Sequence, residues 1–229
     1  MKTKVKINIR PEWLSPTQFL NYQHPSVQGF IADSLGAEKN LLDKAVRLYY
    51  AVRDGIRYDP YRFRMDEKTF VASNTVTEGA AYCVPKALLY AACLRAIGIP
   101  ARVGFADVKN HLTTKRLLEL TGTDVFSWHG YVSVLLNEKW VKATPAFNIE
   151  MCDRFNVLPL EFDGTTDSLM HPYNAKKERH MEYIRQHGEF DDLPYDELKT
   201  NMLRDYPRLL AASEDIGISN FEREAVYIE

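Results

Sequence analysis

The segment Cys83–Ile97, CVPKALLYAACLRAI, constrains the fold of this chain more than any other stretch. Pro85 lies within its first turn, and Gly98 with Pro100 follows its last turn, which are start and stop signals of a helix. Its apolar residues occupy most sides of the helix and are not confined to one stripe. Because such a helix must be covered on most sides, the sequence predicts a central, buried helix.

The flanking segments predict helices and strands that cover it. Residues 41–56, LLDKAVRLYYAVRDGI, have apolar positions at helical spacing, whereas 101–108, ARVGFADV, is typical of a strand. A short helix or a loop is expected within LTTKRLLELTG, residues 112–122, and an N-terminal strand around Val5, Ile7 and Ile9. Together these elements indicate an α+β fold.

Residues 128–147, WHGYVSVLLNEKWVKATPAF, predict a β-hairpin with Asn137-Glu138 as its turn. This register pairs Leu135 with Trp140, Val134 with Val141, and Tyr131 with Thr144. His129, Tyr131, Ser133 and Leu135 then share one face by their period of two, and Thr144 joins that face from the partner strand.

The C-terminal part becomes more polar after Phe147. Helices are predicted within residues 175–188 and 195–213, and we interpret 156–229 as a C-terminal extension packed on a domain of residues 1–155. No repeat or linker composition marks a sharper boundary.

Composition narrows the class of protein. Apolar residues make up 45% of the 229 positions and the formal net charge is −2, so a strongly basic surface for nucleic acid is not expected. No run approaches the roughly 20 apolar residues of a membrane helix. The three cysteines cannot all pair within one chain, which favours a reducing cytoplasm, and no spacing suggests a metal site or a cofactor.

Two cysteines lie on the predicted central helix, in different positions. Cys83 is at its start, where unpaired backbone N–H groups lower a thiol pKa and can bind an oxyanion. Cys93 is in the middle, where a thiol behaves as a small hydrophobe with a raised pKa. Because thiolate is the attacking form, Cys83 is the candidate nucleophile. His129, near the start of the hairpin, is the candidate base.

The order of these motifs resembles the transglutaminase-like superfamily of cysteine acyl-transfer enzymes. The chain shows a helix-start cysteine at 83, LRAIGIPAR at 94–102, WHGYVSV at 128–134 and WVKATP at 140–145, and the resemblance spans roughly residues 41–147. It implies a papain-like core, in which a central helix packs on an antiparallel sheet. It also implies that Cys83 is the nucleophile and His129 the base of a Cys-His-Asp triad.

The third member of the triad departs from the family pattern. Thr144 stands where the family has aspartate, and a hydroxyl can accept the imidazole N–H but supplies no charge. Three alternatives stay open: Thr144 acts as a neutral orienter, Asn148 or Asp153 supplies the missing group, or catalysis has been lost. Threonine is also simply a good strand residue.

The sequence therefore supports two functional hypotheses. The first is a cysteine peptidase or amidase that hydrolyses a peptide or other amide through a Cys83 thioester, with a peptide or protein amide as its partner. The second is an eroded transglutaminase-like protein-binding module. Tyr82, Trp128 and Tyr131 are candidates for the walls of a substrate cleft. Four other histidines, His111, His171, His180 and His187, lie in polar stretches and are expected to be solvated. The oligomeric state is left open.

Overall fold

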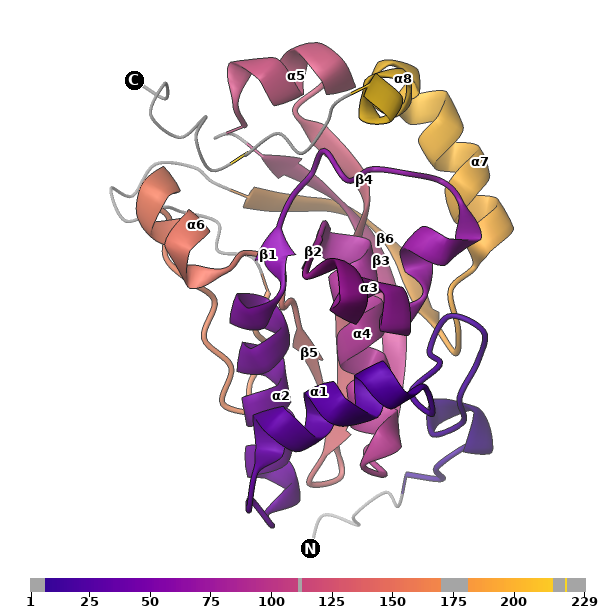
Figure 1. The fold of residues 1–229 in the computed structure, drawn as a ribbon, viewed down its shortest axis with the longest axis vertical. Coiled ribbons are helices and arrows are strands. Elements are labelled where there is room, and N and C mark those ends of the chain that lie inside the picture. The colour runs from indigo at the N-terminus through magenta and orange to yellow at the C-terminus, as the bar shows by residue number, and fades with distance from the viewer. Residues whose placement is uncertain (1–6, 111–112, 170–180, 216–220, 222–229) are drawn as a thin grey trace, which may run out of the picture.

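Helix α4, Cys83–Ala96, lies at the centre of the molecule (Figure 1). The computed structural model describes residues 7–110, 113–169, 181–215 and 221. Every residue of α4 from Val84 to Arg95 is buried, as its apolar sequence predicted. The helix packs against the sheet on one side and against α2, Leu41–Gly55, and α3, Ala72–Glu78, elsewhere.

The sheet that carries α4 has four antiparallel strands in the order β5-β4-β3-β6. Hydrophobic side chains of the two central strands face the helix, among them Val103, Val132 and Val134, which are fully buried. The α+β architecture with an antiparallel sheet is therefore confirmed. The strand bounds are β3 Ala101–Asn110, β4 Val125–Leu136, β5 Lys139–Ala143 and β6 Met181–Phe190.

The β4–β5 hairpin has the register that its sequence predicted. Leu135 pairs with Trp140, and Val134 pairs with Val141. The turn residues Asn137 and Glu138 have φ angles of 48° and 60°, the left-handed conformation that a two-residue hairpin turn requires at both positions.

The remaining elements surround this core. Helices α7 and α8 run along one edge of the molecule beyond β6, and α6 lies near β1 on the opposite side (Figure 1). The bounds are η1 Pro11–Trp13, α1 Pro25–Leu35, β1 Arg57–Tyr58, η2 Glu67–Phe70, β2 Ala80–Ala81, α5 Lys115–Thr121, α6 Ile149–Phe155, α7 Tyr195–Asp205 and α8 Pro207–Asp215.

Two local predictions were wrong. The helix predicted over 175–188 is, in its described part, strand β6 on the open edge of β3. Met181 and Tyr183 follow a period of two, and pairing with β3 satisfies the backbone groups that a helix would have paired internally. At the N-terminus, Ile7 and Ile9 belong to no strand, and Val5 lies outside the described residues.

The strand β6 bears on the predicted division of the chain at residue 155. It extends the sheet of the first part with residues from the second, while α7 and α8 supply the predicted C-terminal helices. The boundary at residue 155 stays a prediction, and the four-stranded sheet contains strands from both sides of that boundary.

A buried cation, Lys86, connects α4 to the end of α2. The ammonium of Lys86, which is fully buried, donates to the carbonyl oxygens of Arg53, at 2.8 Å, and of Ile56. Because both acceptors lie at the C-terminal end of α2, Lys86 supplies donors to carbonyls that the helix leaves unpaired. Burial lowers the pKa of Lys86 to about 7.

Candidate active site

Cys83 is the first residue of α4, in the position that the sequence predicted. Tyr82, the residue before it, makes no side-chain cap, so the N–H groups of the first turn stay available. Strands β1 and β2 pair in parallel just before the helix and hold this start in place, with Tyr58 opposite Ala81. Taken over all its atoms, Cys83 is half-buried.

The protonation state of Cys83 differs from the sequence-based expectation. Burial raises the pKa of its thiol to about 11, although hydrogen bonding from the backbone of Gly130, Val84 and Cys83 itself opposes the rise. A low pKa from the helix N-terminus was expected, and that expectation is wrong. The desolvation of a thiolate among apolar neighbours outweighs the N–H groups that face it.

His129 lies on β4, opposite Ala106 of β3. His129 is 3% exposed, and burial lowers its pKa to about 4, with no charged group of the described residues among the causes. Its Nε2 atom is buried and has no hydrogen-bond partner in the described part of the chain. His129 is therefore neutral at pH 7, and Cys83 is a neutral thiol.

Gly130 brings the two candidate residues together. A Cβ atom at Gly130 would lie 3.0 Å from the Cα of Val84 and 3.3 Å from the carbonyl oxygen of Cys83. Because only hydrogen fits there without a shift of the helix backbone, the strand directly after His129 lies against the first turn of α4.

Cys83 and His129 line one cavity of about 70 Å³, which has room for about five water molecules. Its wall is mostly aromatic and thioether side chains, from Tyr58, Phe63, Tyr82, Phe126, Trp128, Phe147, Met151, Phe155, Met181, Met202, Tyr206 and Phe221. The hydroxyl of Tyr82 is buried and unpaired within the described residues, so it can donate to a group that enters.

Of the three predicted cleft residues, Tyr82 and Trp128 line this cavity and Tyr131 does not. The Tyr131 ring covers Gly104, where an added Cβ would lie 2.2 Å from it. Its hydroxyl donates to Gln186 at 3.2 Å, and the Lys142 ammonium lies 4.9 Å from the ring centre. These contacts hold the Tyr131 side chain against the sheet, outside the cavity.

Thr144 follows the last residue of β5 and is fully buried. Its N–H donates to Ser168 at 3.0 Å and its carbonyl accepts from the hydroxyl of Tyr49 at 3.2 Å. Its side-chain oxygen Oγ1 is buried without a partner among the described residues, as is Nε2 of His129. Since neither atom has a partner, no hydrogen bond joins Thr144 Oγ1 to His129 Nε2, and the orienter role of Thr144 stays a prediction.

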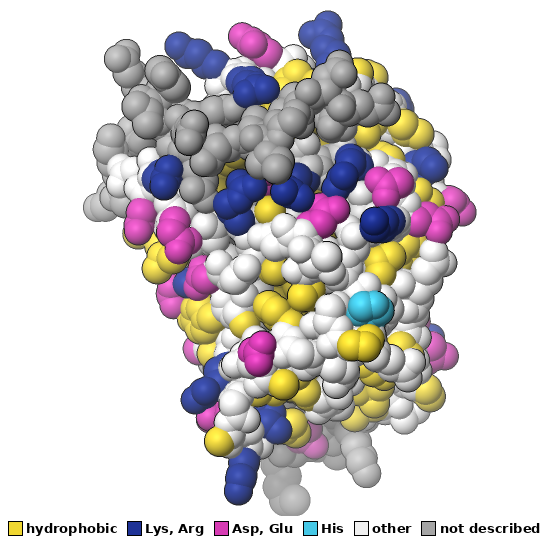
Figure 2. Space-filling view, viewed as in Figure 1, with side chains coloured by type: hydrophobic (Ala, Val, Ile, Leu, Met, Phe, Trp, Pro, Cys, Tyr) yellow, Lys and Arg dark blue, Asp and Glu magenta, His cyan; other side chains and the backbone are white. Residues whose placement is uncertain are grey.

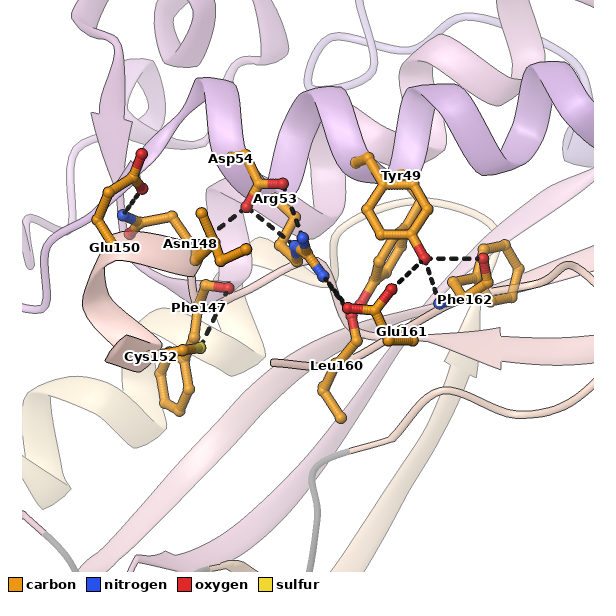
Figure 3. A network of polar contacts seen from close by, with 12 residues as sticks. Tyr49, Arg53, Asp54, Phe147, Asn148, Glu150, Cys152, Leu160, Glu161 and Phe162 are labelled. Atoms are coloured by element: carbon orange, nitrogen blue, oxygen red, sulfur yellow. Dashed lines mark hydrogen bonds and ion pairs between the residues drawn. The ribbon is translucent and has the colours of Figure 1, made fainter. Parts of the chain in front are cut away.

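The alternatives at the third position are engaged elsewhere. Asn148 accepts the N–H of Tyr58 at 2.9 Å and donates to Glu150 at 2.9 Å, and it lies in the polar network beside the end of α2 (Figure 3). Asp153 is exposed on α6. The oxygen and the nitrogen of the Asn148 side-chain amide thus both have partners at the junction of β1 and α6.

Two residues next to the site were missed from the sequence. Asp107 accepts a hydrogen bond from the backbone of Trp128 at 3.1 Å, and His187 lies 2.6 Å from the same carboxylate oxygen. The prediction that His187 is solvated was wrong, because β6 brings it against β3. His111, His171 and His180 lie outside the described residues.

The other two cysteines have no place in this site. Cys93 and Cys152 are buried, and burial raises both of their pKa values, that of Cys152 to about 12. The rise at Cys93 was predicted from its position in the helix. Within the described ranges no three His, Cys, Asp or Glu side chains gather where they could hold a metal ion.

The surface and the helices add two observations. On the face in Figure 2, Lys and Arg side chains are interspersed with Asp and Glu, and yellow apolar side chains lie scattered below them. Among the helices that the structure describes, none has the length and apolar character to cross a membrane.

The central helix, the antiparallel sheet and a cysteine at the helix start define a papain-like class of fold. The family model of the transglutaminase-like superfamily matches residues 29–145, so the chain belongs to that superfamily. A search of the curated proteins gives no match.

Among solved structures, the chain is similar to a candidate cysteine protease from Cytophaga hutchinsonii. The identity is 16% and the TM-score 0.44, over 77% of this chain and 52% of that one. The chain therefore spans about half the length of that protein.

Proposed function

We propose that this protein is a cysteine-dependent acyl-transfer enzyme that hydrolyses a peptide or another amide. The observation that carries the proposal is that Cys83 and His129, from separate elements, line one cavity at the start of α4. Membership of the transglutaminase-like superfamily agrees with it.

The chemistry divides into two steps. In the first, Sγ of Cys83 attacks the carbonyl carbon, His129 takes the thiol proton and delivers it to the leaving nitrogen, and the C–N bond breaks to give an amine and a thioester. In the second, water attacks the thioester through His129, the C–S bond breaks, and the acid and the thiol are released. The backbone N–H groups around Cys83 stabilise the oxyanion in both steps.

The pKa values indicate when Cys83 is activated. With Cys83 at about 11 and His129 at about 4, a thiolate–imidazolium pair is unfavourable in the free protein. His129 therefore removes the proton as the bond to carbon forms. This is the behaviour expected of a site in which a hydroxyl at Thr144 stands in place of a carboxylate.

The wall of the cavity indicates the class of substrate. Burial of an apolar group against aromatic and methionine side chains is favourable, whereas a charged group would lose its hydration there. We infer that the acyl part of the substrate carries an apolar side chain.

The three unpaired cysteines favour a reducing compartment such as the cytoplasm.

The test uses an activated acyl probe, the p-nitrophenyl ester of an apolar N-acyl amino acid. We expect a burst of about one p-nitrophenol per protein chain, and mass spectrometry of the peptides should place the acyl group on Cys83. Cys83→Ala should abolish both signals, and Cys93→Ala is the matched control from the same helix. Acylation that persists in Cys83→Ala contradicts the proposal.

A second candidate function is a protein-binding module with an eroded site. It is favoured by the buried, unpaired atoms of His129 and Thr144 and by a thiol that is protonated at neutral pH. This alternative predicts no burst and no thioester with any apolar ester. The same experiment therefore separates the two functions.

A further inference from the structure

Trp128, the residue directly before His129, has an unusual backbone. Its φ is 57°, in the left-handed region that large side chains rarely adopt. Trp128 is 1% exposed and lies within strand β4, where neither a turn nor a helix end explains the conformation. Something in the surrounding structure must hold it.

The pairing of the strands shows where the irregularity lies. Between β3 and β4 the register shifts between Ala106 and Val108, so that an extra residue of β4 is accommodated just before His129. Between β3 and β6 the register shifts twice, between Phe105 and Ala106 and between Asp107 and Val108. All three irregularities lie around Asp107, between Phe105 and Val108 of β3, and bulges of this kind redirect the side chains that follow them.

Asp107, on the adjacent strand β3, and His187, on β6 at the far side of β3, hold the bulge. Oδ1 of Asp107 accepts the N–H of Trp128 at 3.1 Å and lies 2.6 Å from Nε2 of His187. The imidazole of His187 stacks on the indole of Trp128, with 4.4 Å between ring centres and 14° between planes. One carboxylate oxygen and one ring thus fix the backbone and the side chain of Trp128.

We propose that Asp107 and His187 are positioning residues, which keep Trp128 in its left-handed conformation and thereby aim His129 at Cys83. The inference rests on the proposed function, since it gives His129 the role of base. Without the pair, Trp128 relaxes to extended backbone, and the next residue of the strand rotates with it. His129 then leaves the geometry that proton transfer requires.

The experiment compares variants in steady-state hydrolysis of the apolar p-nitrophenyl ester, with each kcat divided by the number of sites titrated in the burst. Asp107→Ala and His187→Ala should lower kcat by about 10- to 100-fold and change KM by less than about threefold. Asp107→Asn keeps an oxygen acceptor and should stay within about fivefold of the unsubstituted protein.

The matched control is Glu189→Gln. Glu189 on β6 forms an ion pair with Arg102 on β3 at 3.2 Å, between the same two strands but away from Trp128, and the substitution removes the negative charge of that pair. It should leave kcat unchanged. His187→Phe keeps a ring for stacking and removes only the hydrogen bond, so it tests the pair if the alanine variants do not fold. The ring signal of His129 in the NMR spectrum, assigned with His129→Gln, should shift in Asp107→Ala and not in the control.

Each outcome has one meaning. Unchanged kcat per titrated site in the His187 and Asp107 variants, with an unshifted His129 signal, overturns the positioning role and leaves the proposed function standing. A loss in Asp107→Asn as large as in Asp107→Ala also overturns it, because charge and not the hydrogen bond would then matter. Turnover that survives Cys83→Ala overturns the proposed function instead, and the His129 signal still tests the positioning.

Discussion

The reactivity of Cys83 towards iodoacetamide as a function of pH tests the neutral state of the site directly. With a pKa of about 11, the thiol is ionised to about 1 part in 10,000 at pH 7, whereas a free thiol of pKa about 8.5 is ionised to about 3%. The smaller thiolate fraction alone slows alkylation by about 300-fold. A more basic thiolate is more nucleophilic, which recovers about 10-fold, so a net slowing of about 20- to 30-fold is expected.

The assay follows alkylation by peptide mapping from pH 5 to 11, with a model thiol in parallel. The rate at Cys83 should rise about tenfold per pH unit from 7 to 10 and show no plateau at acid pH, because deprotonation is the only source of thiolate. His129→Gln should leave this profile unchanged within about threefold, since a neutral imidazole with a pKa of about 4 adds no charge.

An opposite profile would refute the reasoning. A rate at pH 7 equal to or above that of the model thiol, with an acid plateau that His129→Gln removes, would mean that a thiolate–imidazolium pair forms in the free protein. Alkylation of the two buried cysteines, Cys93 and Cys152, does not enter the measured rate, because the assay follows the Cys83 peptide alone.

Three further predictions concern single side chains. Thr144→Asp should raise the pKa of His129 by about 1–3 units in an NMR titration, with Thr144→Asn as the neutral control; an unmoved pKa in a folded protein would place the orienter elsewhere. Lys86→Met leaves two buried carbonyls without a donor and should lower the free energy of unfolding in urea by about 1–3 kcal/mol, while exposed Lys39→Met changes it by less than about 0.5 kcal/mol. Phe221→Ala removes a ring stacked on Phe155 at 5.0 Å in the cavity wall, so acylation of Cys83 by a bulky apolar ester should speed up about tenfold relative to the acetyl ester; an equal effect on both would argue against an enlarged cavity.

The candidate cleft residues show how much of the cavity wall can be predicted from the type of side chain alone. Trp128 and Tyr82 line the cavity, and Tyr131, from the same motif, lies over Gly104 on the sheet. The sequence places aromatic residues near the site, but the pleat and the bulge of β4 decide which of them face the cavity.

Local patterns determined the helix of Cys83, the register of the β4–β5 hairpin and the order of the motifs, because helix signals, period and turn chemistry act over a few residues. Tertiary structure alone decided three other features. It made 181–190 a strand, since an open edge of β3 supplies partners that no local pattern records. It raised the pKa of Cys83, since desolvation depends on every neighbour in space. It also joined Asp107, Trp128 and His187, which are up to 80 residues apart in the chain and meet only because three strands lie side by side.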